Sequence, residues 1–225
     1  MENKYEKILR LFADADNEIR DWMNRPFLAN SYAIGTDAYR MCYINKDKVG
    51  DIHILTEYDP QNVVIIIPQK TKSILSINVK NFVTKISKLD KIDETRTIGE
   101  DLDCGACCGE CEIELDYSYN GKNYYIEAKC PVCDGSGLES ESREVPTGKL
   151  ITDPKSIIKI GNSTFYFDKI EPLIRICEIL KSDTIELTYQ ESAAHGSNFT
   201  ISDVDILIMP MQFNDDTDKI SFSLD

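Results

Sequence analysis

Six of the eight cysteines lie between residues 104 and 137, and this clustering is the strongest chemical signal in the sequence. "CGAC" at 104–107 and "CPVC" at 130–133 are two Cys-x-x-Cys knuckles. Two such knuckles can bring four thiolates to the corners of a tetrahedron, which is the geometry that Zn²⁺ takes in closed structural sites. The spacing therefore predicts one structural Zn²⁺, held by Cys104, Cys107, Cys130 and Cys133.

Two alternatives to this ligand set remain open. Cys108 and Cys111 have the same two-residue separation, so they could replace Cys104 and Cys107 as the first knuckle. A Cys-x-x-Cys pair can also be a redox dithiol. Two pairs that converge, neither of which opens an obvious helix after a strand, favour the metal over the dithiol.

The compartment argues against structural disulfides. The N-terminal segment "MENKYEKILRLFADADNEIRDW" is charged throughout and lacks the apolar run of a secretory signal. No apolar run approaches the roughly 18 to 20 residues of a membrane span. We therefore expect a cytoplasmic protein without a membrane partner, in an environment that keeps thiols reduced.

The charge of the chain is strongly negative but uneven. The net charge is −14 over 225 residues, so the surface taken as a whole repels nucleic acid. No acidic residue lies between Asp59 and Asp90, however, and "NVKNFVTKISKLDK" has the apolar spacing of an amphipathic helix. The predicted helix 79–91 would carry its basic side chains outward at Lys80, Lys85, Lys88 and Lys91. Such a run is either a solvated face or a contact surface for a polyanion.

The pattern of the remaining chain predicts an α+β protein with one inserted module. Before the cysteines we expect a helix at 4–24, a β-hairpin at 25–45 and strands at 51–58 and 62–68. From the cysteines onward we expect a hairpin at 111–130 that turns at Asn120-Gly121, followed by a mobile acidic linker at 135–148. After the linker we expect a strand at 156–162 and a helix at 166–180 capped by Asp168. Three further strands are expected at 184–191, 198–203 and 204–210. Cys42 and Cys177 fall in apolar patterns and are interpreted as buried small hydrophobes.

The knuckles resemble the cysteine-rich zinc repeats of DnaJ-type chaperones. "CPVCDGSG" fits C-x-x-C-x-G-x-G throughout, and "CGACCGEC" fits it except that Cys111 replaces the last glycine. DnaJ modules carry four such repeats and two metals, whereas this chain has two repeats. The resemblance implies one Zn²⁺ and says little about chaperone activity.

Three segments on either side of the cysteines resemble bacterial sliding clamps, the β subunit of DNA polymerase III. "RPFLANSYAIGTDAYRMCYI" is similar to the clamp segment that ends Thr-Asp-Gly-His-Arg-Leu, with departures at Ala38 and Tyr39. "VVIIIPQKTKSIL" is similar to the clamp's Ile-Ile-Pro-x-Lys strand, and "VDILIMPM" to its closing strand. The resemblance implies a sliding-clamp-like fold of two β-α-β-β-β halves, at 1–95 and 149–225, interrupted by a zinc-ribbon-like module and acidic linker at 96–148.

In sliding clamps the helices line the side that faces DNA. The resemblance therefore implies that Lys80, Lys85, Lys88 and Lys91 approach the phosphates of duplex DNA by long-range attraction rather than by base readout. A clamp ring contains six such domains, and this chain supplies one. A repurposed clamp fold that serves as a binding or adaptor domain is therefore an equal alternative to a working clamp.

The sequence contains no recognisable catalytic arrangement. Neither His53 nor His195 has a nucleophile signature beside it, and no phosphate-binding glycine loop is present. A zinc site made only of sulfur is normally closed to substrate. The sequence thus predicts a non-enzymatic binding protein connected with DNA replication. The alternative is a zinc-dependent protein-interaction module that contacts its partner through the insert and does not contact DNA.

Overall fold

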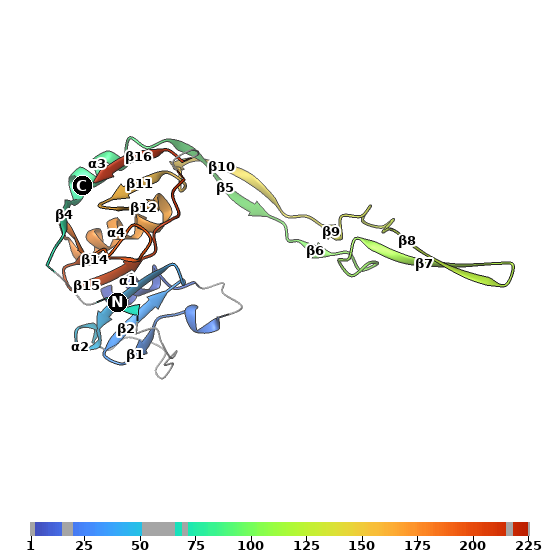
Figure 1. Cartoon of the computed structure of the whole chain (residues 1–225), viewed down its shortest axis with the longest axis horizontal. Coiled ribbons are helices and arrows are strands. Elements are labelled where there is room, and N and C mark those ends of the chain that lie inside the picture. The colour runs from blue at the N-terminus through green and yellow to red at the C-terminus, as the bar shows by residue number, and fades with distance from the viewer. Residues whose placement is uncertain (1–2, 15–19, 51–65, 69–71, 215–217, 225) are drawn as a thin grey trace. The chain divides into compact units, whose positions relative to one another are not determined.

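The protein divides into two compact units, which a computed structural model describes over residues 3–14, 20–50, 66–68, 72–214 and 218–224. Unit 1 comprises Met1–Asp90 and Thr152–Asp225, and unit 2 comprises Lys91–Ile151. Unit 2 is thus inserted between two stretches of chain that fold together (Figure 1).

Unit 1 is built on a seven-stranded sheet with the order β1-β2-β3-β15-β14-β13-β4. Its strands are β1 (Phe27–Ala29), β2 (Tyr32–Thr36), β3 (Arg40–Asn45), β4 (Leu75–Asn78), β13 (Thr184–Tyr189), β14 (Ser197–Ile201) and β15 (Val204–Ile208). Every neighbouring pair is antiparallel. The sheet joins strands from both stretches of unit 1, so the two stretches share one sheet.

The strand order is mirrored about the centre of this sheet. β1, β2 and β3 form one meander after helix α1 (Lys4–Arg10), and β13, β14 and β15 form another after helix α4 (Phe167–Leu180). The last strands of the two meanders, β3 and β15, pair antiparallel, with Cys42 opposite Ile206. Strand β12 (Ser163–Tyr166) precedes α4, so the second half reads β-α-β-β-β, and the described part of the first half reads α-β-β-β.

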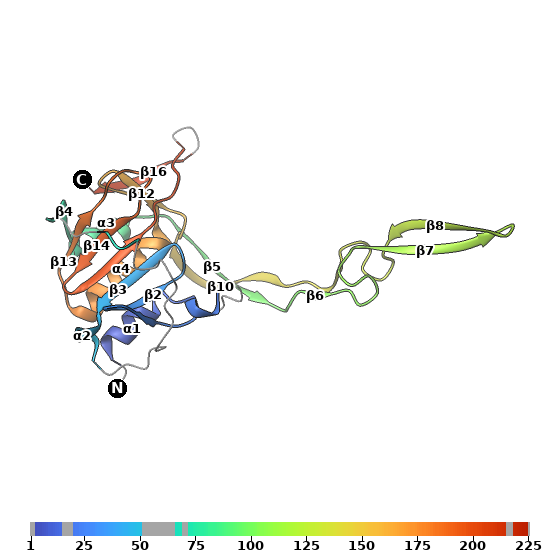
Figure 2. The same ribbon diagram turned by 60° about the horizontal axis from the view of Figure 1, so that its bottom comes forward.

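A second, smaller sheet of unit 1 has the order β12-β11-β16, with β11 (Ile157–Ile160) at its centre and β16 (Ile220–Leu224) parallel to it. Helix α3 (Val79–Ile86) follows β4 directly, and the short helix α2 (Lys46–Val49) follows β3. Figure 2 shows α1, α3 and α4 on the same side of the large sheet.

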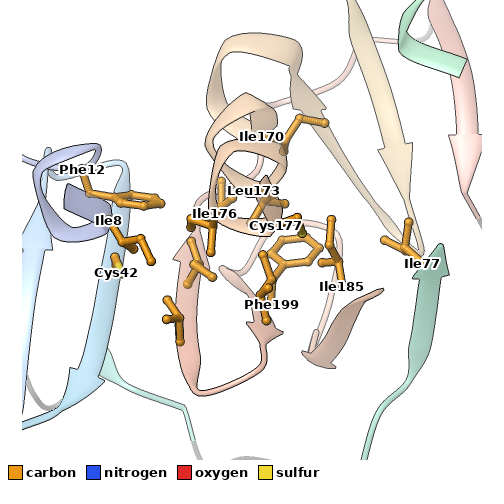
Figure 3. Packing of buried hydrophobic residues seen from close by; sticks show 14 of the residues in the cluster. Ile8, Phe12, Cys42, Ile77, Ile170, Leu173, Ile176, Cys177, Ile185 and Phe199 are labelled. Atoms are coloured by element: carbon orange, nitrogen blue, oxygen red, sulfur yellow. The ribbon is translucent and has the colours of Figure 1, made fainter. Parts of the chain in front are cut away.

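The main core of unit 1 lies between these helices and the large sheet. Figure 3 shows Ile8 of α1, Phe12 just after it and Ile176 of α4 directed toward Cys42 and Phe199 on the strands. All five side chains are fully buried. A second cluster, which includes Trp22 and Phe27 in edge-to-face contact, is formed by other residues of β1, β2, β3 and β15.

Gly35 on β2 explains how closely α1 approaches the sheet. A Cβ atom at Gly35 would lie 2.2 Å from the carbonyl oxygen of Leu9, which is far inside van der Waals contact. Any other residue would therefore push the helix away from β2 and open the core around Leu9.

The clamp-like motif "TDAYRM" forms the turn between β2 and β3. The Thr36 hydroxyl donates to the Arg40 carbonyl at 2.8 Å, and the Arg40 guanidinium pairs with Asp37 at 2.6 Å. The same guanidinium donates at 3.2 Å to the Asp168 carbonyl, which would accept from residue 172 in a regular helix. Because Pro172 has no N–H, Arg40 supplies the missing donor. These motif residues thus join the two halves of unit 1.

Unit 2 consists of three two-stranded ladders. They pair β5 (Lys91–Ile98) with β10 (Arg143–Thr152), β6 (Leu102–Asp103) with β9 (Leu138–Ser140), and β7 (Glu112–Tyr119) with β8 (Lys122–Lys129). The knuckles lie between the last two ladders, because the first connects β6 to β7 and the second connects β8 to β9. Asn120 and Gly121 have φ of 51° and 73°, as a two-residue hairpin turn requires.

The predicted α+β class, the hairpin at 25–45, the hairpin turning at Asn120-Gly121 and the three closing strands are confirmed. Buried Cys42 and Cys177 are confirmed as well. The predicted strand at 51–58 and most of the one at 62–68 lie outside the described residues. The division at 95 and 149 into two clamp-like halves and a module stays a prediction.

Four predictions are wrong, and the helix 79–91 is one of them, because α3 ends at Ile86. The first helix ends at Arg10 rather than at residue 24. The acidic stretch 135–148 is not a linker, because it contributes β9 and part of β10. Asp168 is not the cap of α4, whose N-cap is Tyr166 without a side-chain hydrogen bond.

Among the described helices, none combines the length and apolar character that crossing a bilayer demands.

Candidate metal centre

The sulfur atoms of Cys104, Cys107, Cys130 and Cys133 all lie within 4.8 Å of one another. The Cys104 and Cys130 sulfurs are 3.8 Å apart, and those of Cys107 and Cys133 are 3.7 Å apart. Cys104 and Cys130 are fully buried. The structure thus brings both predicted knuckles to one point, in an arrangement compatible with a metal site.

The distances between sulfurs fit a tetrahedral thiolate site better than disulfides. Four Zn–S bonds of about 2.3 Å directed to the corners of a tetrahedron place the sulfurs about 3.8 Å apart. A disulfide would hold its two sulfurs at about 2.05 Å. All eight cysteines are free thiols. The four clustered residues therefore fit Zn²⁺, and the ion would draw the two knuckles together and neutralise their charge.

The two knuckles have the same backbone conformation at equivalent positions of the repeat. Cys108 and Asp134 have φ of 54° and 52°, and the glycines that follow them have 85° and 79°. At the last position of the repeat Gly137 has φ of 80°, and Cys111, which replaces a glycine there, has 66°. The first knuckle thus keeps the backbone of the repeat despite the cysteine.

Backbone hydrogen bonds join the knuckles with the same symmetry. The Cys104 N–H donates to the Gly137 carbonyl at 2.8 Å, and the Cys130 N–H donates to the Cys111 carbonyl at 3.0 Å. A Cβ at Gly137 would lie 2.7 Å from the carbonyl oxygen of Gly109. Gly137 is therefore required both by its positive φ and by the close approach of the other knuckle.

Backbone N–H groups are directed at the sulfurs. The Gly137 N–H donates to the Cys133 sulfur at 3.3 Å. Burial raises the pKa of the Cys133 thiol, but hydrogen bonds from Gly137 and Gly135 outweigh it and lower the pKa to about 6. Burial and the hydrogen bond with Cys133 raise the pKa of Cys107 to about 12. One of the four thiols therefore ionises readily, whereas several thiolates side by side repel one another and need a cation.

The alternative ligands Cys108 and Cys111 lie outside the four-sulfur group. Cys108 is exposed, and the Cys111 sulfur is 3.7 Å from the carbonyl oxygen of Gly109. The structure therefore brings together Cys104 and Cys107, rather than the alternative pair, with the second knuckle.

The four predicted DNA-contacting lysines do not lie on one helix, which corrects the predicted helix 79–91. Lys80 and Lys85 lie on α3, Lys88 lies in the turn after it, and Lys91 begins β5 in unit 2. The Lys85 ammonium donates to the Ser223 carbonyl at 2.7 Å and lies 5.6 Å from the centre of the Phe222 ring. No acidic residue lies in the first turn of α3.

Sequence reasoning missed an acidic hollow beside the first knuckle. A cavity of about 640 Å³ is lined in part by Cys107, Cys108 and Ile113, together with the carboxylates of Glu110, Glu112, Glu114 and Glu127. The alternation "EIELD" after the knuckle was the available signal, because it places carboxylates on one side of a strand. Elsewhere, the Ser192 hydroxyl and the Nδ1 atom of the exposed His195 share a hydrogen bond of 2.7 Å.

No protein-family model matches the sequence. No curated protein matches it either. Similar solved structures are bacterial sliding clamps. The β subunit of DNA polymerase III from Borrelia burgdorferi is 11% identical, with a TM-score of 0.47 over 94% of this chain and 62% of that one.

Two further clamps give similar values. The β sliding clamp of C. crescentus is 12% identical, with a TM-score of 0.45 over 94% of this chain and 64% of that one. The Helicobacter pylori β clamp bound to a DNA ligase peptide is 9% identical, with a TM-score of 0.48 over 93% of this chain and 63% of that one. This chain spans less than two thirds of the length of these clamps. These structures come from the family that the sequence resembles, and the likeness assigns no role to a residue of this chain.

Proposed function

We propose that this chain is a non-enzymatic binding protein whose unit 2 is organised by one structural Zn²⁺ on Cys104, Cys107, Cys130 and Cys133. The observation that supports the metal is the group of four sulfurs within 4.8 Å. The matching φ values of the two knuckles support the DnaJ-like description of the repeat. A site filled by four sulfurs leaves no position for substrate, so the ion would have a structural role.

X-ray absorption at the zinc edge tests the metal directly. The proposal expects one zinc per chain, with four sulfur neighbours at about 2.3 Å and no nitrogen or oxygen in the first coordination sphere. A nitrogen or oxygen ligand would point to an open site and to a different function. A unit 2 that stays folded without metal would remove the metal part of the proposal.

For unit 1 we propose a role connected with DNA replication, in a cytoplasmic setting, with duplex DNA as the partner. The clamp-like motifs in sequence order support this role, as does the mirrored order of the two meanders. The contact would be made by Lys80 and Lys88, with Lys85 beside them, through attraction to phosphate. Lys91 belongs to unit 2 and would contribute separately.

DNA binding is tested with a 20-base-pair duplex at two salt concentrations. We expect affinity to fall steeply with salt, and to fall at least tenfold in the double variant Lys80→Glu/Lys88→Glu. The matched control Lys46→Glu/Lys48→Glu makes the same charge change on α2 and should bind like the wild type. Equal loss in both variants would assign the effect to net charge and contradict a specific surface.

The second candidate function is a zinc-dependent protein-interaction module, with unit 2 as the contact surface. It is favoured by the exposure of large apolar side chains on the β7–β8 hairpin, among them Tyr119 at 65% and Tyr125 at 68%. Large apolar side chains that gather on one element mark an interaction site more often than chance. Absence of DNA binding at low salt, with zinc and fold intact, would favour this function.

A further inference from the structure

The outer edge of β7 is unpaired. β7 and β8 form a two-stranded sheet, and no third strand among the described residues pairs with either of them. Figures 1 and 2 show the two strands side by side over their whole length. An edge strand presents a row of backbone N–H and C=O groups that can pair with another chain. The edge of β7 is eight residues long.

The two faces of β7 differ sharply in chemistry. Side chains alternate along a strand, so Ile113, Leu115, Tyr117 and Tyr119 share one face. Leu115 is 48% exposed and Tyr117 is 53% exposed. The partner strand continues this face, because Leu115 lies opposite Ile126 and Tyr117 stacks on Tyr124 with ring centres 5.1 Å apart. One face of the hairpin is thus apolar and open to solvent.

The other face of β7 is acidic. It carries Glu112, Glu114 and Asp116 in succession, and Glu114 lies directly opposite Glu127 of β8. Like charges opposite one another destabilise a strand pair. Among the ion pairs of the described residues none involves these four carboxylates. Glu112, Glu114 and Glu127 also line part of the hollow beside the first knuckle, together with Glu110, so negative charge gathers at the base of the hairpin.

We propose that the outer edge of β7 binds an extended segment of a partner protein in which apolar residues alternate with lysine or arginine. Such a segment would add a third strand, a known mode of peptide recognition. Its apolar side chains would extend the face of Leu115 and Tyr117, and its cations would lie beside Glu112, Glu114 and Asp116. This inference rests on the second candidate function and specifies its surface and its partner.

Other occupants fit this edge less well. Nucleic acid would meet three carboxylates in a row. A second copy of β7 would place acidic side chains opposite acidic side chains, which disfavours pairing. The edge of β8 is a poorer site because Lys122 and Lys129 stand at its two ends, and lysines on an edge strand oppose the addition of another strand.

Fluorescence anisotropy with three labelled ten-residue peptides tests the proposal on the zinc-loaded full chain. One peptide alternates Leu and Lys, the second alternates Leu and Glu, and the third alternates Ser and Lys. We expect the Leu–Lys peptide to bind at least tenfold more tightly than either of the others. Equal binding of the Leu–Lys and Ser–Lys peptides would reduce the interaction to charge alone and overturn the proposal.

Variants locate the binding to β7. Leu115→Ser and Glu114→Lys should each weaken binding of the Leu–Lys peptide at least fivefold. Glu139→Lys, on the exposed part of β9, makes the same charge change away from the hairpin and should stay within twofold of the wild type. The zinc content of each variant is measured beside its affinity. A full complement of zinc with unchanged peptide affinity in Leu115→Ser and Glu114→Lys would overturn the inference while leaving the metal site intact.

A second measurement needs no synthetic peptide. The triple variant Glu112→Lys/Glu114→Lys/Asp116→Lys turns β7 itself into an alternating basic and apolar strand. Mixed with the wild type, it should form a one-to-one complex in sedimentation velocity, whereas each protein alone should be monomeric. A wild-type dimer that Leu115→Ser dissociates would identify a second copy as the occupant and contradict the proposal.

Discussion

Units 1 and 2 are stabilised in different ways. Unit 1 contains a large cluster of fully buried aliphatic and aromatic side chains, among them Ile176 and Phe199. In the described part of unit 2 the only buried apolar group consists of Cys104, Cys107 and Cys130. Every residue of β7 except Ile113 is exposed. Unit 1 can therefore fold on burial alone, whereas unit 2 has almost no apolar core, and on the proposed zinc site it would depend on its four thiols.

The largest expected effect is the unfolding of unit 2 while unit 1 stays folded. Cys130→Ser should abolish zinc binding and unfold residues 91–151, because a single missing thiolate opens a closed site. Unit 1 should keep its cooperative unfolding transition. Zinc content and limited proteolysis measure the two results. Cys108→Ser is the matched control, since this thiol is exposed and lies outside the four-sulfur group, and loss of zinc in that control would contradict the ligand assignment.

A substitution in the core of unit 1 should have the reverse effect, because it destabilises unit 1 and leaves the zinc site intact. Phe199→Ala should lower the free energy of unfolding of unit 1 by about 3 to 5 kcal/mol, since it removes a fully buried ring. Zinc content should stay at one per chain. Urea denaturation followed by the fluorescence of Trp22, together with metal analysis, checks both parts. A loss of zinc would show that the two units are coupled.

Two glycine substitutions, one in each unit, sharpen the comparison and should have smaller effects. Gly35→Ala should destabilise unit 1 by about 1 to 3 kcal/mol, because its Cβ would meet the Leu9 carbonyl. Gly137→Ala should leave unit 1 unchanged and weaken zinc binding, because both its φ and its contact with Gly109 exclude a side chain. Competition with a chromogenic chelator measures the second effect. Destabilisation of unit 1 by Gly137→Ala, or weaker zinc binding in Gly35→Ala, would contradict the division into units.

The smallest expected effect concerns the hairpin itself. Tyr117→Ser removes a stacked, half-exposed ring and should change the stability of unit 2 by less than about 1.5 kcal/mol. Zinc content should not change. A large loss of zinc would mean that the apolar face of the hairpin, rather than the metal, organises unit 2. Zinc release during thermal denaturation provides the measurement.

The sequence predicted the group of four sulfurs well because the spacing of the cysteines alone constrains it. The two Cys-x-x-Cys pairs and the Asn120-Gly121 turn were sufficient to place four sulfurs together. The choice between Cys104 and Cys108 was not predictable, because both registers have the same spacing. The backbone geometry favours Cys104, since Cys108 takes the position that Asp134 has in the second repeat and lies outside the sulfur group.

The errors arose where a residue pattern crosses a change of element. The predicted helix 4–24 includes Ile8, Phe12 and Trp22, but Ile8 and Phe12 join the main core and Trp22 packs in the second cluster. Leu89 keeps the apolar spacing of α3 after the helix has ended, so the predicted helix was extended as far as Lys91.

The strands of unit 2 gave too little signal for a different reason. β10 is largely exposed, and β9 and β10 are held by backbone pairing rather than by an apolar face. Their sequence "LESESREVPTG" therefore has the composition of a linker. Hydrophobic periodicity detects strands only when one face is buried. The open apolar face of β7 was not predictable for the opposite reason, since alternation is the pattern of a strand that buries one face, whereas β7 leaves both faces exposed.

Limited proteolysis of the purified chain, before and after zinc is removed by a chelator, tests the central claim most directly. We predict one zinc per chain and resistance across residues 91–151 while the metal is bound. After chelation the same residues should be cleaved rapidly, and unit 1 should remain intact. Metal-free protein that stays equally resistant across residues 91–151 would contradict the account.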